Sequence, residues 1–401
     1  MKIGILTWAF NTNYGGALQA FSLNRYLSKL RYDSEIIDFL PKKSDLRVFQ
    51  NFTYKWNPNS RFVKNVFRLT LYRLIVLLFK GDNVFTSLRV WNSKLFFHKY
   101  LRPTFKIRNS EELNVQRRYG AILIGSDQVW NPNSLDESFL LLSVPDSVKK
   151  LAYAPSVAVR TINAKIGLYR RALPRFQAVS LRERSALKEI EICYGSPVKW
   201  VVDPVLLLTR FEWGKELDLT EGKVKSYDFI YWLSDLESEI GNIITYANKN
   251  HRNIHLYVDL ISFPLKSWRP SILVRHIYNV FRLLCNPYIK FRKWAGPKTF
   301  VKEISCADKV ITNSFHGMMF SIIFNRRFML ISDDERKGME SRMLDFLEKI
   351  HARVQVMRSL ATGLENSDFA DTLNEQSRCE LEKWICESQS WLINKLKEAI
   401  K

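Results

Sequence analysis

The chain has 401 residues, of which 46% are hydrophobic and 13% aromatic, and it carries a formal net charge of +21. This composition excludes an intrinsically disordered protein, and the length predicts two domains because one hydrophobic core rarely organises so many residues. The five cysteines lack paired C-x-x-C spacing, which argues against a disulfide framework or a zinc site and fits a reducing cytoplasm.

The N-terminal segment Met1-Lys2-Ile3-Gly4 leads directly into a strand pattern and lacks the apolar block and cleavage site of a signal peptide. No stretch approaches the roughly 18 apolar residues that a membrane span requires. These features predict a cytoplasmic protein, with peripheral attachment to the inner face of the cell membrane left open.

Strand-like and helix-like patterns alternate along the first half of the chain, and a helical pattern that runs to about Leu30 follows the first strand. Short apolar segments of this kind are typical of the buried strands of a parallel sheet. They occupy residues 2–8, 34–39, 120–125, 150–156, 177–181 and 198–202.

A basic insertion interrupts this alternation at about residues 42–118, with 17 basic and 4 acidic side chains, a net charge of +13. Residues 260–302 add 9 basic and no acidic side chains. Basic and apolar residues interleave at 61–80, which predicts a helix lying on an anionic membrane surface. An ordinary core helix with solvated basic edges is the alternative. No recognised nucleic-acid-binding module accompanies the charge, so nucleic acid is not an expected partner.

The second half begins with a polar segment at 209–226, which reads as a linker. A new alternation of strands and helices follows, and one more helical segment ends the chain. Its elements are a strand at 229–233, a helix at 239–250, strands at 254–258 and 307–312, a helix at 318–324, a strand at 328–331 and a helix at about 375–400.

This order of elements predicts an α/β fold with two Rossmann-like domains that face each other across a cleft. The first domain covers residues 1–208 and contains the basic helical insertion, and the second covers 209–370. Residues 371–401 form a C-terminal helix that braces the domains.

The segment Asn313-Ser314-Phe315-His316-Gly317 joins a buried strand to a helix in the second domain. In an open α/β sheet such a turn lies at the carboxyl edge, where ligands bind and where the helix dipole favours an anion. His316 is therefore a candidate proton donor, with Asn313 and Ser314 as hydrogen-bond donors to the same ligand. The alternative is a histidine that merely caps the helix.

Two strand ends of the first domain carry comparable residues. Asn13, Gly15 and Gly16 follow the first strand, where small residues allow close approach to the backbone. The spacing is not G-x-G-x-x-G, so no dinucleotide is expected. Ser126 and Asp127 follow another strand, and Asp127 either orients an acceptor hydroxyl or caps its own turn.

These segments, together with Ser180-Leu181-Arg182-Glu183-Arg184-Ser185 and Val201-Val202-Asp203-Pro204-Val205-Leu206-Leu207, resemble the polysaccharide pyruvyl transferase family in order and spacing. The resemblance runs from Lys2 to roughly Leu347, with the basic insertion as its poorly matching part. It implies a GT-B-like architecture and transfer of pyruvate from phosphoenolpyruvate onto a sugar diol as a cyclic ketal. Capsule, exopolysaccharide or cell-wall glycan synthesis is the implied setting. The resemblance implies no cofactor and no metal.

The resemblance also implies residue roles. His316 matches the histidine of the family's Ser-x-His-Gly segment and is the expected acid. Arg182 matches the arginine of the Ser-x-Arg-Glu segment, and its planar group suits bidentate contact with phosphate or carboxylate. A surface salt bridge from Arg182 to Glu183 or Glu189 is the alternative. The expected catalytic residues are His316, Arg182 and Asp127, and the expected substrate-binding residues are Asn13, Gly15, Gly16, Ser126, Asn313, Ser314, Gly317 and Arg342.

One departure from the family pattern concerns Ser156-Val157-Ala158, which stands where family members tend to have Ser-Phe-Gly. It puts the acceptor contacts there in question, and we read the insertion as a site for a lipid-linked saccharide acceptor. The expected partners are phosphoenolpyruvate, a glycan or lipid-linked acceptor, and an anionic membrane surface. A GT-B glycosyltransferase that uses a nucleotide sugar, and a non-catalytic membrane-associated glycan assembly factor, remain alternatives.

Overall fold

The computed structural model describes most of the chain, and every structural statement below concerns the described residues. These are residues 1–10, 13–39, 83–102, 104, 106–107, 111–112, 118–219, 224–236, 238–260, 278–279, 281–292, 294–332, 337–354, 356–365 and 373–400. The helix predicted at 61–80 lies outside them.

The first sheet has six parallel strands, whose side chains in β1 and β5 are buried on both faces, as in other parallel sheets. The strands in spatial order are β2 (Ser34–Ile36), β1 (Ile3–Leu6), β5 (Ala121–Ile124), β6 (Lys149–Ala152), β7 (Ala178–Leu181) and β8 (Lys199–Trp200). Its helices include α1 (Tyr14–Lys29), α6 (Ile166–Ala172) and α7 (Leu187–Tyr194).

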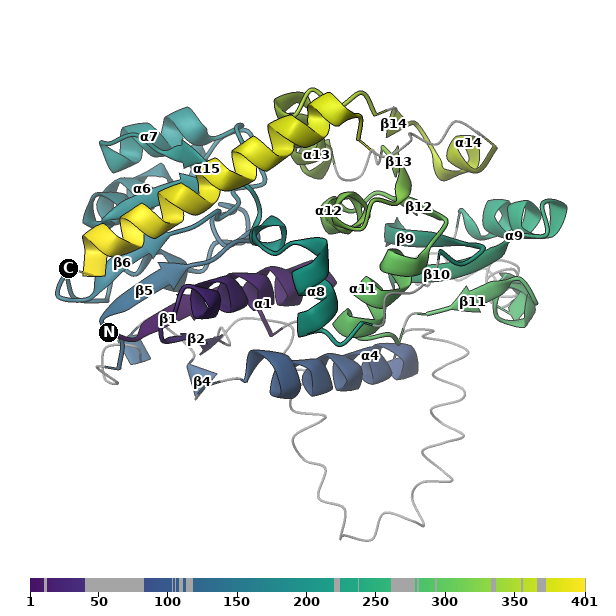
Figure 1. Cartoon of the computed structure of the whole chain (residues 1–401), viewed down its shortest axis with the longest axis horizontal. Helices are drawn as coiled ribbons and strands as arrows, with labels where there is room; N and C mark the ends of the chain where they lie inside the picture. Colours follow the sequence, from purple (N-terminus) through teal and green to yellow (C-terminus); the bar gives the residue numbers. More distant parts are fainter. Residues whose placement is uncertain are drawn as a thin grey trace, which may run out of the picture.

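The second sheet is also six-stranded and parallel. Its spatial order is β11 (Ile289–Phe291), β10 (Asn253–Leu260), β9 (Tyr227–Asp235), β12 (Lys309–Thr312), β13 (Arg327–Ile331) and β14 (Val356–Met357). The helices around it are α9 (Ile240–Lys249), α11 (Pro297–Cys306), α12 (Phe315–Ile323), α13 (Lys337–Lys349) and α14 (Leu360–Glu365). Figure 1 shows the two sheets on opposite sides of the molecule, with α1, α11 and α12 between them. The predicted α/β fold of two Rossmann-like halves is confirmed.

Two local predictions differ from the structure. The segment 34–39 splits, because β3 (Asp38–Phe39) leaves the sheet and pairs with β4 (Lys106–Ile107). The linker predicted at 209–226 is wrong in its first part, which forms α8 (Arg210–Glu216). A capping box between Thr209 and Glu212 satisfies the first amides of that helix and explains why so polar a segment is helical.

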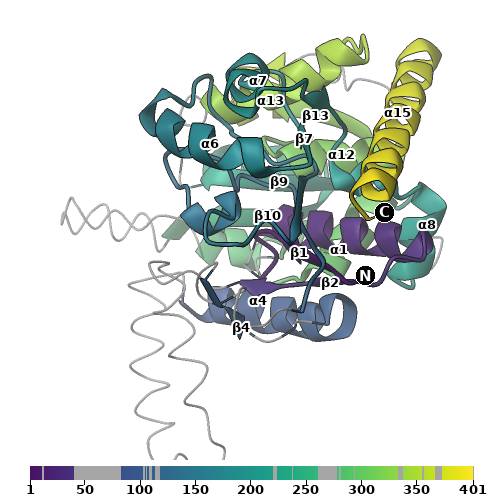
Figure 2. The same cartoon turned by 90° about the vertical axis from the view of Figure 1, so that its left-hand side faces the viewer.

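Helix α4 (Asn83–Phe96) continues as a π-helix over Phe97–Leu101 and runs beneath α1 and α11 (Figures 1 and 2). It is attached to the second domain by Arg89, which donates to the Val258 carbonyl at 3.4 Å, and by Asn92, which donates to the Trp294 carbonyl at 2.7 Å. This described part of the basic insertion therefore packs on both domains.

The C-terminal helix α15 (Glu375–Ile400) also contacts both domains (Figure 1). Its Trp384 donates to the Trp200 carbonyl at 3.1 Å and packs against Phe346 of α13 with 5.6 Å between ring centroids. None of the helices in the described part of the chain combines the length and apolar content that crossing a bilayer requires.

Candidate active site

Two helix N-termini, one from each domain, meet between the sheets. Helix α12 follows β12, and Ser314 caps it by accepting from the Gly317 amide, which places His316 in the first turn rather than before it. Helix α1 follows β1 and is capped by Asn13, whose side chain accepts from the Gly15 and Gly16 amides. A Cβ atom on Gly15 would lie 1.9 Å from His316 Nδ1, so only glycine allows this contact.

A buried polar cluster lies on the other side of the imidazole and centres on one oxygen of Asp203, which is 1% exposed. Asp203 Oδ2 accepts from Arg182 Nη1 at 2.5 Å and from Ser126 Oγ at 3.0 Å, and it lies 3.7 Å from His316 Nε2. Asp203 Oδ1 accepts from the Val205 amide at 3.0 Å. One carboxylate therefore positions a predicted cation, a predicted hydroxyl donor and the predicted acid.

The electrostatics of this cluster favour the charged pair. Burial acts to raise the pKa of Asp203, but the Arg182 charge and the contact with His316 outweigh it and hold that pKa well below its ordinary value. Burial also opposes the charge of Arg182, yet Asp203 raises its pKa above the ordinary value. The surface salt bridge considered for Arg182 is wrong, because the arginine is buried and its partner is Asp203.

Arg342 of α13 brings a second buried guanidinium to the cluster. Arg182 and Arg342 lie 4.8 and 5.8 Å from the centroid of the Phe315 ring. Arg342 Nη1 donates to Ser156 Oγ at 3.3 Å, but no carboxylate of the described residues is within ion-pair distance of it. Burial, reinforced by the nearby charge of Arg182, lowers the pKa of Arg342 to about 10. The surroundings thus disfavour the positive charge of Arg342.

Several nitrogen atoms that line the cluster have no hydrogen-bond partner among the described residues. They are Arg182 Nε and Nη2, Arg342 Nε and His316 Nε2. The three residues are at most 8% exposed, so water does not readily replace the missing partners. An oxygen-rich anion would satisfy these donors and offset the charge of Arg342.

The remaining predicted residues lie around this centre and hold the backbone in place. Asn313 accepts from the Leu233 amide at 2.9 Å and donates to Ser234 Oγ at 3.1 Å. Ser314 accepts from Gly317, where a Cβ would lie 2.6 Å from Thr312 Oγ1.

Asp127 is buried, has a positive φ of 70°, and accepts from the next amide, that of Gln128, at 2.9 Å. This contact agrees with the turn-capping alternative, and it leaves Asp127 Oδ2 for other contacts. The acceptor role assigned to Asp127 stays a prediction.

Sequence reasoning assigned no catalytic or substrate-binding role to three residues of this cluster: Asp203, Glu183 and Ser156. Glu183 Oε1 accepts from Ser156 Oγ at 3.1 Å and from the amides of Val157 and Ala158, so it shapes the segment that departs from the family pattern. The sequence did contain a signal for Asp203, because this aspartate follows a predicted strand and precedes a proline. No group of three or more possible metal ligands occurs among the residues that the structure describes.

The family model for polysaccharide pyruvyl transferases matches residues 13–335. The chain belongs to this family. No curated protein sequence matches the chain.

Solved structures similar to this family member cover nearly its whole length at low identity. A putative UDP-N-acetylglucosamine 2-epimerase from Listeria monocytogenes is 8% identical, with a TM-score of 0.50, and the match covers 100% of this chain and 96% of that one. UDP-GlcNAc 2-epimerase from Methanocaldococcus jannaschii is 11% identical, with a TM-score of 0.49 and coverage of 99% and 100%. E. coli ADP-heptose LPS heptosyltransferase II is 12% identical, with a TM-score of 0.37 and coverage of 97% and 100%. At 8% identity, the similarity to the Listeria monocytogenes structure shows the fold alone, and this fold is GT-B-like.

Proposed function

We propose that this pyruvyl transferase family member moves pyruvate from phosphoenolpyruvate onto two hydroxyl groups of a sugar, forming a cyclic ketal. The observation that carries the proposal is the pair of buried guanidinium groups with unpartnered N–H groups beside an unpartnered imidazole nitrogen. Phosphoenolpyruvate carries both a carboxylate and a phosphate, so it is an anion with enough oxygen atoms for both arginines.

The reaction sets clear chemical demands. Protonation of the methylene carbon makes C2 of the donor electrophilic, a sugar hydroxyl adds to C2, phosphate leaves, and the neighbouring hydroxyl closes the ring. The two hydroxyl protons balance the proton gained by the methylene carbon and the proton carried away by phosphate. The site must therefore supply an acid, cations for the donor and a group that positions the hydroxyls.

His316 is the proposed acid, and it acts through Nε2 because Nδ1 faces Gly15. Asp203, 3.7 Å from Nε2, orients the ring and balances its charge once it is protonated. Arg182 and Arg342 bind the donor and stabilise the departing phosphate. Asp127 and Ser126 then lie at the strand end where an acceptor hydroxyl is expected.

The experiment that tests this proposal measures phosphate release from phosphoenolpyruvate with and without a saccharide acceptor. We expect release only when an acceptor with two neighbouring hydroxyls is present, and an acid-labile ketal in the product. His316→Gln should lower the rate by about 10²–10⁴-fold, while phosphoenolpyruvate still raises the melting temperature of the variant.

The matched control is His255→Gln, a second buried histidine that pairs with Glu303 at 2.9 Å and should keep the wild-type rate. Near-normal transfer by His316→Gln would exclude His316 as the acid. Stabilisation by nucleotide sugars and not by phosphoenolpyruvate would instead favour a glycosyltransferase.

A further inference from the structure

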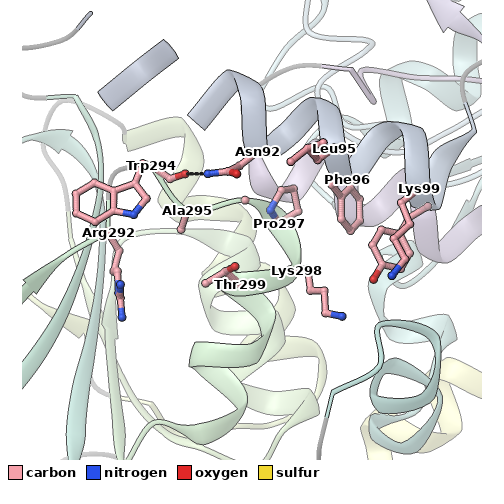
Figure 3. Close-up of a pocket in the computed structure, with 12 residues that line it drawn as sticks. Asn92, Leu95, Phe96, Lys99, Arg292, Trp294, Ala295, Pro297, Lys298 and Thr299 are labelled. Carbon is pink, nitrogen blue, oxygen red and sulfur yellow. Dashed lines mark hydrogen bonds between the residues drawn. The ribbon is translucent and has the colours of Figure 1, made fainter. Parts of the chain in front are cut away.

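A cavity of about 290 Å³ lies between the end of α4 and the start of α11, so that each domain supplies one wall (Figure 3). Figure 3 shows Lys99 and Lys298 at one end of it and Arg292 and Trp294 at the other. The volume is close to that of small ligand-binding pockets, which begin at about 300 Å³. The cavity is separate from the residues around His316.

The lysine end of the cavity has an excess of positive charge. Lys99 Nζ and Lys298 Nζ lie 3.7 and 3.8 Å from the same oxygen of Asp218, whose side chain is 69% exposed. Two ammonium groups therefore share one carboxylate that water screens strongly. Arg292 at the other end already pairs with Glu303 at 3.2 Å, so the two lysines are the cations open to an incoming anion.

Aromatic side chains and backbone amides complete the walls. The two ammonium groups lie 5.1 and 6.0 Å from the centroid of the Tyr100 ring. Phe96 lines the cavity beside Tyr100, and Trp294 closes the opposite end. Helix α11 begins in the cavity without a side-chain cap; Pro297 has no N–H, so the amides of Lys298 and Thr299 are the ones left to a ligand. Aromatic faces suit the C–H surface of a sugar ring, and the lysines suit an acidic substituent on it.

We propose that this interdomain cavity binds an anionic unit of the glycan acceptor, a sugar that bears a carboxylate or a phosphate. That this sugar belongs to a glycan acceptor rests on the function proposed above. The cavity is joined to the proposed catalytic residues through α1. Ala295 lines the cavity, and its carbonyl accepts from the Tyr14 hydroxyl of α1 at 2.9 Å. Gly15, which follows Tyr14 in the chain, contacts His316. A glycan held here lies beside the element that carries Gly15.

The test uses calorimetric titration of the full-length protein with three probes: trigalacturonate, mannose 6-phosphate and neutral maltotriose. We expect at least one anionic probe to bind about tenfold or more tightly than maltotriose, in a salt-dependent way. Lys99→Gln combined with Lys298→Gln should remove that preference, because two charge-assisted contacts are lost. Both lysines are surface residues, so the variant is expected to fold, and Lys298→Gln alone should show a partial loss.

The matched control carries Lys188→Gln and Lys249→Gln, two exposed lysines outside the cavity, and should bind as the wild type does. The preferred probe identifies the acidic group as carboxylate or phosphate. Equal binding of charged and neutral sugars, no binding of either anionic probe, or full binding by the double variant would each overturn the proposed site. Binding of an anionic probe without any stabilisation by phosphoenolpyruvate would overturn the proposed function and leave this site standing.

Discussion

Gly15 and His316 belong to different domains, yet the glycine backbone lies directly against the imidazole: a Cβ at Gly15 would lie 1.9 Å from Nδ1 and 2.4 Å from Cγ and Cε1 of the ring. The contact leaves Nε2, which lies 3.7 Å from Asp203, as the ring nitrogen that faces the buried polar cluster. It also makes the position of the imidazole depend on how closely the two domains approach.

The first prediction concerns Gly15→Ala. The added methyl group must displace the His316 ring, and a misplacement of about 1 Å is enough to lower a catalytic rate by about 10²-fold. We expect that loss in acceptor-dependent phosphate release, with an unchanged circular dichroism spectrum. Gly167→Ala in α6 is the control, since nothing lies within 4 Å of the added atom there. A wild-type rate for Gly15→Ala would show that the contact is not required.

The second prediction concerns Asp203→Asn. The substitution leaves Arg182 buried without its counter-charge, which typically costs about 3 kcal/mol or more of unfolding free energy. Urea unfolding at neutral pH measures this loss, and phosphate release should fall as well because His316 loses its orienting group. Glu387→Gln, which breaks an exposed pair with Lys199, should cost less than about 1 kcal/mol. Equal losses in the two variants would contradict the assignment.

The same pair predicts a pH dependence. The pKa of Asp203 is lower in the folded protein than in the unfolded chain, so the unfolded state takes up its proton first as the pH falls. The stabilisation is therefore complete at neutral pH and diminishes below about pH 4, toward the pKa of the folded state. The difference in unfolding free energy between the wild type and Asp203→Asn should shrink over this acidic range. A constant difference would show that Asp203 is not the titrating group.

The third prediction separates stability from binding at Arg342. Burial and Arg182 disfavour its charge, so Arg342→Met should leave the melting temperature unchanged or raise it. The same variant should bind phosphoenolpyruvate more weakly, because one of the two cations is lost. Arg252→Met is the contrast: Arg252 pairs with Asp228 at 2.5 Å and Asp308 at 2.7 Å, and its loss should destabilise the protein. Normal donor binding by Arg342→Met would remove Arg342 from the donor site.

The fourth prediction concerns the membrane and rests on the sequence of residues 61–80. Replacement of Arg61, Lys64 and Arg68 by Gln should weaken sedimentation with anionic vesicles, since each such residue contributes about 1 kcal/mol near an anionic surface. Binding by the wild type should decrease as salt increases. The same substitution at Lys188, Lys249 and Lys397 is the control. Equal sedimentation with neutral and anionic vesicles would refute the prediction.

The sequence was sufficient to find most strands and the sheet edge at which the site lies, but not the short strands β11 and β14 at the edges of the second sheet. Periodic apolar segments report burial in a sheet, and a histidine after such a segment falls at the carboxyl edge. Which side chains meet between the domains depends on how the domains pack, and no local sequence pattern contains that information. The alternative for Arg182 was therefore a surface salt bridge to Glu183 or Glu189, whereas the structure pairs it with Asp203.

Two other features of the structure have local causes. The 209–226 segment is polar, but Thr209 and Glu212 form a capping box that starts α8. Asn313 and Ser314 are predicted to contact the ligand, which stays a prediction, and in the structure their side chains hold β9 and the first turn of α12 in place. Side chains of this kind serve the backbone and the ligand equally well, so residue type alone cannot separate the two roles.

Helix α15 fastens the two domains to each other by polar contacts on both sides. In the first domain, its Trp384 donates to the Trp200 carbonyl. In the second domain, its Arg378 donates to the Asn325 side chain, and Trp384 packs against Phe346. Any change in the angle between the domains must therefore disturb contacts of this one helix, so its removal should leave the interdomain angle less constrained.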